Sequence, residues 1–354
     1  MNYLDTLNNE VKQYFKILSP EFPEWLLEYI NTPPMQRNAK ISNNCGINYS
    51  KCFQLRYIYT SLDHGVGTAL ILWHFTHDKK QTLAGLFHDI STPCFKHCID
   101  FMNGDSQTQE STEELTDSMI RNSKEIMSLL ERDGIKIEEV NDYKLYPIAD
   151  NPTPQLAADR FEYTFSGGLI WGGIWNSLSD IQKFYNNITI GKNEKGIDEL
   201  MFQNKEICEE YISCISKLWP EWISSKDRVV MQFYADICKS MNVRNYLSIE
   251  DLYELSEKEV IDKIIHCEDK YLSESFQKFQ NTTQVYDSNT SVSNKYCINT
   301  RAKIRYIVPL VQTENGPVRI NKISEQADKD IQNYLAYKQS PYVYFDFDFK
   351  PYEA

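Results

Sequence analysis

The sequence predicts a mainly α-helical protein that ends in a small α+β region. Apolar side chains recur at helical spacing in most segments before about residue 280, and this spacing is the main sequence signal for helices. A polar stretch, 281–295, follows, and residues 342–349 then alternate in the manner of a β-strand. The chain has 354 residues, 42% of them apolar, so it can bury a large core, and a disordered chain is disfavoured.

The N-terminal half is expected to consist of packed helices. Residues 2–30 carry apolar positions at helical spacing, and a second short helix follows Pro23. Residues 68–75, TALILWHF, are apolar on nearly every side, which fits a helix buried at the centre of a bundle. The apolar stretch 83–90 comes next. The other predicted helices share the same spacing and lie at residues 113–132, 156–161, 180–185, 205–218, 226–241 and 249–278.

Strand-like patterns are confined to the C-terminal part. Residues 305–311 and 342–349 are rich in Val, Ile, Tyr and Phe, whereas residues 325–337 have a helical pattern. The polar stretch before them reads as a loop or linker. The predicted division is a helical domain over 1–280, a linker over 281–295 and a small α+β region over 296–354.

The net charge and the short length of the apolar runs argue against two classes of protein, general nucleic-acid binders and membrane-spanning proteins. The formal net charge of -13 argues against a general nucleic-acid binder, because phosphate backbones are bound by dense Lys and Arg surfaces. No run approaches the roughly 20 apolar residues that cross a bilayer, and the start lacks a basic segment followed by an apolar one. We therefore expect a cytoplasmic protein without a membrane span. Nine cysteines without any C-x-x-C pair fit reduced core residues.

Histidines are clustered in a way that predicts a metal site. Five of the six lie between positions 64 and 97. His64 opens one predicted helix, and the pair His88-Asp89 closes the next apolar one. Imidazole nitrogens and carboxylate oxygens together bind divalent metals such as Zn, Mn, Fe or Ni. Asp159, in LAADRFEY, is the best fourth ligand, because a carboxylate preceded by three apolar residues on a helix is costly to bury unpaired. The alternative is that each is an ordinary surface or capping group.

The spacing H…HD…D resembles the HD superfamily of metal-dependent phosphohydrolases. Surrounding segments narrow the resemblance to the deoxynucleoside triphosphate triphosphohydrolase group, whose successive blocks they match in order over roughly residues 28–170. These segments are INTPPMQR (30–37), Gly46, SLDHGVG (61–67), LAGLFHDISTPCFKHCID (83–100) and ADRFEY (158–163).

The resemblance implies an HD-domain helical bundle with the α+β region as a C-terminal cap, and a metal core at about 28–170. It implies one divalent ion (Mn, Fe, Ni, Co, Zn or Mg) and hydrolysis of a phosphate ester or anhydride, with a nucleotide as the expected substrate. Members of the group are often oligomers, so a homo-oligomer is expected. The implied metal ligands are His64, His88, Asp89 and Asp159.

Further site residues follow from position in the resemblance. Asp89, Glu113 and His97 are the implied catalytic residues. The implied substrate contacts are Asn43, Arg160, Tyr163 and Thr92.

Three departures from the group's pattern bear on the activity. Thr92 and Thr112 stand where the group has histidines, and Ser61 stands where it has an arginine. A hydroxyl cannot replace imidazole as a general acid or base near neutral pH. The alternative function is therefore a catalytically impaired HD-domain protein that binds or senses a nucleotide. A third hypothesis is a structural protein whose histidine cluster is accidental.

The segment GGLIWGGIW (167–175) carries glycine and apolar residues together. It is suited to close helix packing, and alternatively it would line an apolar pocket for a base. His74 and the pair His77-Asp78 are expected to be structural.

Overall fold

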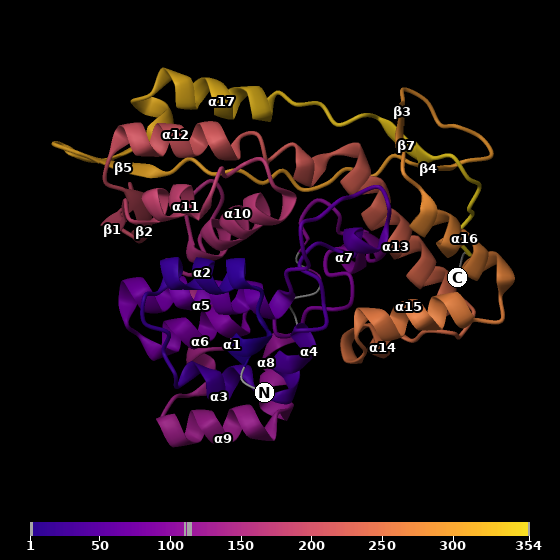
Figure 1. Ribbon diagram of the computed structural model, residues 1–354, viewed down its shortest axis with the longest axis horizontal. Helices are drawn as coiled ribbons and strands as arrows, with labels where there is room; N and C mark the ends of the chain where they lie inside the picture. The colour runs from indigo at the N-terminus through magenta and orange to yellow at the C-terminus, as the bar shows by residue number, and fades with distance from the viewer. Residues whose placement is uncertain (1–2, 110, 112–114, 353–354) are drawn as a thin grey trace.

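The computed structural model describes residues 3–109, 111 and 115–352. Within them, the N-terminal helices other than α7 form one compact group, which is indigo to magenta in Figure 1, whereas α7 packs against α13. The helices from the N-terminus to α9 have the following bounds. These helices are α1 (Tyr3–Thr6), α2 (Asn9–Leu18), α3 (Leu26–Ile30), α4 (Pro33–Asn38), α5 (Ser61–Thr76), α6 (Lys79–Phe87), α7 (Cys98–Met102), α8 (Thr116–Asn122) and α9 (Lys124–Asp133). The later helices are α10 (Ala158–Trp171), α11 (Leu178–Tyr185), α12 (Lys205–Ile215), α13 (Ser225–Val243), α14 (Ile249–Glu254), α15 (Glu257–His266), α16 (Lys270–Asn281) and α17 (Glu325–Leu335).

Helix α5 is the centre of the N-terminal group. Its first twelve residues, Ser61 to Leu72, are all buried. The burial predicted for residues 68–75 therefore holds for residues 68–72, whereas His74 is exposed. It packs against α2, α6 and α10. Gly85 on α6 lets α5 and α6 come close, because a Cβ there would lie 2.3 Å from Leu72 Cδ1. Thr60 begins α5 with a capping box closed by Asp63, which fixes the first turn of this helix.

Two predicted helices are interrupted. The described part of 113–132 forms α8 and α9 in place of one helix, because Ser123 leaves the helical conformation and its hydroxyl caps α9. Residues 249–278 form α14, α15 and α16, because Ser256 and Asp269 each cap a new helix. Such caps satisfy backbone N–H groups that a continuous helix would satisfy internally.

Strands form two small sheets among the described residues. One has the order β1-β2-β5-β6 and the other β3-β7-β4. Their bounds are β1 (Ile188–Lys192), β2 (Asp198–Phe202), β3 (Tyr286–Ser288), β4 (Tyr296–Ile298), β5 (Leu310–Thr313), β6 (Gly316–Arg319) and β7 (Tyr342–Phe345). Strand β2 pairs parallel with β5, so residues from before and after position 280 share one sheet.

Several strand predictions were wrong in detail. No strands were expected at β1 and β2, and β2 escapes notice because four consecutive residues are buried, without the alternation of a half-buried strand. The expected loop 281–295 contains β3, and the expected strand 305–311 begins only at Leu310. A mainly α fold with an α+β region is confirmed. The HD bundle and the division of the chain into domains stay predictions.

Arg319, the last residue of β6, ties this sheet to the helical part. Its guanidinium donates to both carboxylate oxygens of Glu199 on β2, at 2.5 and 2.8 Å, and to both oxygens of Glu194, at 2.8 and 2.9 Å. Glu199 is fully buried, and it also accepts the backbone N–H of Leu156 at 3.1 Å. Because Leu156 lies two residues before α10, this ion pair helps to place the start of α10.

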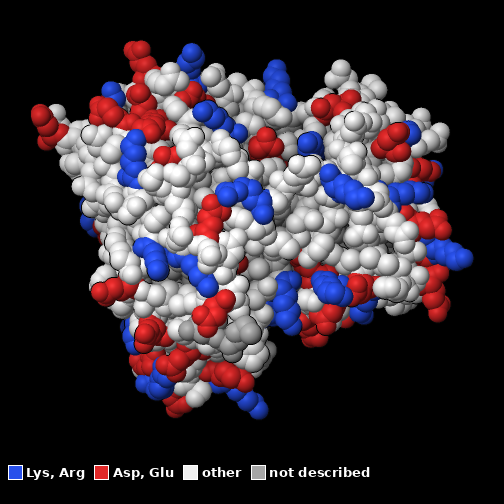
Figure 2. Space-filling model, in the orientation of Figure 1, with Lys and Arg blue, Asp and Glu red and all other residues white. Residues whose placement is uncertain are grey.

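The described helices include none that is both long and apolar enough to cross a bilayer. On the face in Figure 2, basic and acidic side chains are intermingled, and no continuous stripe of either charge is visible there.

Candidate metal centre and its pocket

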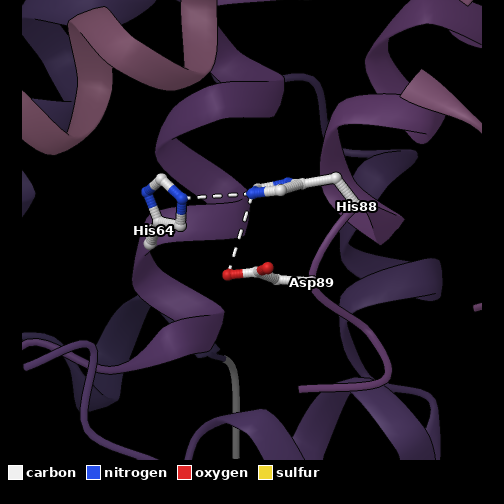
Figure 3. A group of neighbouring side chains, drawn as sticks. All are labelled: His64, His88 and Asp89. Carbon is white, nitrogen blue, oxygen red and sulfur yellow. Dashed lines mark hydrogen bonds and ion pairs between the residues drawn. The ribbon is translucent and has the colours of Figure 1, made fainter. Parts of the chain in front are cut away.

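Helix ends bring the four predicted ligands together. His64 lies in the first turn of α5, His88 and Asp89 directly follow α6, and Asp159 is the second residue of α10. Because α5 packs against both α6 and α10, the side chains converge from three parts of the chain. In Figure 3 the imidazoles of His64 and His88 point at each other, with the Asp89 carboxylate beside them.

The distances are those of a site that can hold one cation. Ligand atoms of His64, His88 and Asp89 all lie within 4.8 Å of one another. The two Nε2 atoms are 3.1 Å apart, and Asp89 Oδ2 lies 3.8 Å from Nε2 of His88. Asp159 is outside that 4.8 Å group, but its Oδ1 lies 3.0 Å from Nε2 of His64 and 3.6 Å from Nε2 of His88.

The hydrogen bonds made by the Nδ1 atoms of the two rings determine whether the Nε2 atoms carry a hydrogen or a lone pair. Nδ1 of His88 lies 2.7 Å from the carbonyl oxygen of Gly85, which can only accept, so this Nδ1 carries the hydrogen. Nδ1 of His64 contacts the carboxylate of Glu162 in the same way. In the neutral rings both Nε2 atoms therefore present lone pairs, and carboxylate oxygens face them. This arrangement requires a cation, either a proton or a metal ion.

Electrostatic interactions favour a protonated His64. Burial opposes protonation of His64, but Glu162 and Asp159 outweigh it and raise the pKa of His64 to about 10. Burial alone would raise the pKa of both Asp89 and Asp159. Lys96 and the histidines outweigh it for Asp89 and hold its pKa far below the usual range. The histidines likewise lower the pKa of Asp159 to about 2.

Metal binding should therefore release a proton and strengthen with pH. Because the pKa of His64 is raised, its protonation stabilises the fold. This contribution is fully present below the pKa of the unfolded chain and is lost as pH rises through about 10. We expect apparent Mn²⁺ affinity to rise up to about tenfold per pH unit between about pH 6 and 8. Calorimetric titration in buffers of different ionisation enthalpy measures the proton release. An affinity that does not change over this range would contradict the assignment.

Glu162 is a site residue that sequence reasoning missed. It is fully buried and accepts hydrogen bonds from Tyr59 at 2.6 Å and Tyr14 at 3.2 Å besides its contact with His64. Gly67 makes room for it, because a Cβ there would lie 2.7 Å from Glu162 Oε1. Its position three residues after Asp159 on one helix was the available signal, since such residues share a face.

Replacing Glu162 should weaken metal binding without removing a ligand. The Glu162→Gln variant loses the charge that orients His64 and makes it more basic, and partners of this kind are worth about 10–100-fold in metal affinity. We expect a loss of this size for Mn²⁺, measured by calorimetry at fixed pH. Glu250→Gln, at an exposed position of α14, is the matched control and should bind Mn²⁺ as the wild type does. Equal affinities for both variants would contradict the role of Glu162.

Lys96 is a second residue that was not anticipated. Its ammonium lies 2.5 Å from Asp89 Oδ2 and 2.7 Å from Asn43 Oδ1, and the residue is buried. Phe95 and Lys96 are consecutive residues with positive φ, 64° and 46°, an uncommon backbone for residues other than glycine. This turn directs the lysine toward the predicted ligand Asp89. A lysine in a loop carries no sequence signal for such a position.

A pocket of about 920 Å³ opens onto this centre. That volume is in the range of pockets that bind small molecules. His64, His88, Asp89, Asp159 and Lys96 line it. Of the other predicted site residues, those that line it are Asn43, His97, Arg160 and Tyr163.

The predicted substrate contacts differ in their surroundings, and their roles stay predictions. Arg160 donates to Asp150 at 3.0 Å and to Asn151 Oδ1 at 2.6 Å, which holds its guanidinium on the neighbouring loop. Thr92 is buried and is not among the residues that line the pocket. Its carbonyl oxygen accepts from Arg37 at 2.6 Å. Glu113, like Thr112, lies outside the described residues.

His97 is engaged at both nitrogens. Nδ1 lies 2.9 Å from Asp100 Oδ2, and Nε2 lies 3.3 Å from a guanidinium nitrogen of Arg305. Burial, together with the charges of Arg305 and Lys96, lowers the pKa of His97. A neutral ring with both nitrogens occupied fits a residue that holds Arg305, and its predicted catalytic role stays a prediction.

Comparison with known proteins gives distant matches. The chain is 22% identical over 306 residues to an uncharacterized protein of Bacillus subtilis, covering 86% of this chain and 89% of that protein. It is 26% identical over 129 residues to a metal-dependent phosphohydrolase of Cordyceps militaris, covering 36% of each. No family model matches.

Two solved structures share the fold. One is a hypothetical protein from Aquifex aeolicus, with a TM-score of 0.61 and 15% identity over 91% of this chain and 92% of that one. The other is a phosphohydrolase from Bacteroides thetaiotaomicron, with a TM-score of 0.61 and 12% identity over 92% and 96%. At these identities the likeness concerns the fold alone.

Proposed function

We propose that the chain is a metal-dependent hydrolase of a phosphate ester or anhydride, with a nucleotide as its substrate. The proposal rests on one observation. The Nε2 atoms of two imidazoles face each other at the wall of a large pocket, and two carboxylates lie beside them. The proposed ligands are His64, His88, Asp89 and Asp159. The names of the Cordyceps militaris relative and the Bacteroides thetaiotaomicron structure support the same class of reaction.

The residues of the chain suit this chemistry. A divalent ion supplies a Lewis acid that activates water and neutralises phosphoryl oxygens. Gly85 and Glu162 engage the Nδ1 atoms of His88 and His64, which leaves both Nε2 atoms facing the site. Lys96 adds a buried positive charge on the pocket wall next to Asp89, where the anionic substrate has to lie. Tyr163 and Asn43 are proposed to contact the substrate from the same wall.

The alternative, a protein that binds a nucleotide without hydrolysing it, is favoured by one observation. Thr92 does not line the pocket. Besides the two proposed ligands, His97 is the histidine that lines it among the described residues, and both of its nitrogens are engaged, by Asp100 and by Arg305. General acid–base help from a free imidazole is therefore not visible among the described residues.

A screen for phosphate release decides between the two functions. Purified protein is first analysed for bound transition metals, then tested on nucleoside mono-, di- and triphosphates with Mn, Fe, Ni and Co. The proposal expects metal-dependent release of phosphate or pyrophosphate. Nucleotides that raise the melting temperature but are recovered intact would favour the binding protein. Light scattering on the same sample tests the proposed homo-oligomer.

A further inference from the structure

Asp227 lies in the first turn of α13, but its side chain does not close a capping box. Ser224 caps this helix and accepts the backbone N–H of Asp227 at 3.2 Å. Helices α5, α14 and α15 have the same arrangement, and in each the acidic side chain closes the capping box by accepting the N–H of the cap residue. The carboxylate of Asp227 makes no such bond. It lines the pocket of the metal centre instead.

The Asp227 carboxylate has no hydrogen-bond or ion-pair partner among the described residues. Burial raises its pKa to about 7, although the charge of Arg305 acts in the opposite direction. A partly buried carboxylate without a partner costs free energy. Such a cost is repaid when a ligand supplies the missing donors.

Apolar and aromatic side chains line the same pocket as Asp227. Met231 lies one helical turn further along the same face of α13 and also lines the pocket. Trp222 packs edge-on against Tyr163, with ring centres 5.3 Å apart. Gly167 lies next to Trp222, since a Cβ built there would stand 3.6 Å from the indole, at an ordinary contact distance. Tyr163, Gly167 and Trp222 all line the pocket.

Arg305 supplies a hydrogen-bond donor in the same region. Its guanidinium is positioned by Gln109 at 2.5 Å and by His97 at 3.3 Å, both through one terminal nitrogen. Arg305 also lines the pocket, and it is close enough to Asp227 and Tyr163 for its charge to affect the pKa of each. The pocket lining therefore combines an acceptor, Asp227, with a donor, Arg305, and with the aromatic rings of Tyr163 and Trp222.

We infer that this part of the pocket binds a guanine base, with Asp227 as the residue that selects it. The edge of guanine offers two adjacent N–H donors and one carbonyl oxygen, which match the Asp227 carboxylate and the Arg305 guanidinium. Adenine lacks the adjacent donors. Enzymes that read a base in a pocket use hydrogen bonds to this edge and stacking on aromatic side chains. The inference rests on the proposed function, and it names the class of nucleotide that the site takes.

Nucleosides test this inference without depending on hydrolysis, because they carry no phosphate. Guanosine, inosine and adenosine are titrated into the full chain by calorimetry or ligand-observed NMR. We expect guanosine to bind about tenfold more tightly than inosine, which lacks one donor, and more tightly still than adenosine. Asp227→Asn should reduce the preference for guanosine over inosine to less than about twofold.

Asp251→Asn is the matched control, because Asp251 occupies the same helix position in α14 and closes its capping box. It should lower the melting temperature and keep the preference for guanosine. Asp227→Asn should keep the melting temperature or raise it, since no bond in the free protein is lost. A preference for guanosine that survives Asp227→Asn, equal binding of the three nucleosides, or no binding of any would overturn the inference. A protein that selects guanosine but releases no phosphate would uphold it while overturning the proposed hydrolysis.

Discussion

His88→Ala should leave the protein without its metal and without measurable turnover. His88 is buried, and its Nε2 faces both Nε2 of His64 and Oδ1 of Asp159. The substitution removes a proposed ligand, so the loss should exceed the 10–100-fold that partners of ligands contribute. We expect a fall of more than about 100-fold in Mn²⁺ affinity, with phosphate release reduced to background. Metal analysis and calorimetry measure the first effect, and the phosphate assay measures the second.

A second His-Asp pair provides the control for this result. His77 and Asp78 follow α5, and the exposed His77 ends that helix with a φ of 51°. His77→Asn keeps a residue type that tolerates this backbone and should retain metal and turnover. His88→Gln, which nearly preserves side-chain volume, guards against a folding defect in the alanine variant. Full metal content in either His88 variant would contradict the proposed metal site.

Arg319→Met should strongly destabilise the fold. The substitution leaves the fully buried carboxylate of Glu199 without its cation, and breaking a buried pair from one side costs about 3–5 kcal/mol. Glu199 also accepts the N–H of Leu156 just before α10, so the start of α10, with Asp159, should loosen as well. Urea unfolding followed by circular dichroism measures the loss, and Mn²⁺ titration measures the effect on the site.

The double variant Glu199→Leu, Arg319→Met separates charge from packing. With both charges removed no buried charge is left unpaired, because the other partner of Arg319, Glu194, is exposed. Much of the stability should therefore return. Arg121→Met removes an arginine that pairs with Asp117 and Glu138 at the exposed surface and should hardly move the urea midpoint. A single Arg319 variant as stable as the wild type would show that this ion pair does not hold the sheet to α10.

Helices were predictable where the spacing of apolar residues matches the buried face. Helix ends were less predictable where a single capping side chain determines them. The apolar run of α5 predicted a central buried helix, and α5 is buried over its first twelve residues. The break at Ser123 depends on one hydroxyl that caps α9, and a periodic pattern does not reveal it. Strand β2 was missed because its buried residues do not alternate with exposed ones, and because its partner β5 lies more than a hundred residues away.

Some candidate site residues could likewise be predicted from the sequence, and others could not. His64, His88, Asp89 and Asp159 stand out because ionisable groups beside apolar runs are costly to bury, and the structure brings them into one cluster. Lys96 is placed by a turn with positive φ. Asp227 is available to the pocket because its side chain does not close the capping box of α13. Neither feature has a signature in residue type or spacing. Arg305 comes from a distant segment and reaches the pocket only through tertiary packing.

The parallel pairing of β2 with β5 has a consequence for biosynthesis. When the ribosome has made β1 and β2, the outer edge of β2 has no strand to pair with, because β5 is still more than a hundred residues away. An unpaired apolar edge invites association with other chains. The nascent protein should therefore depend on chaperones until position 313 has left the exit tunnel, and chains that stop before it should accumulate as aggregates.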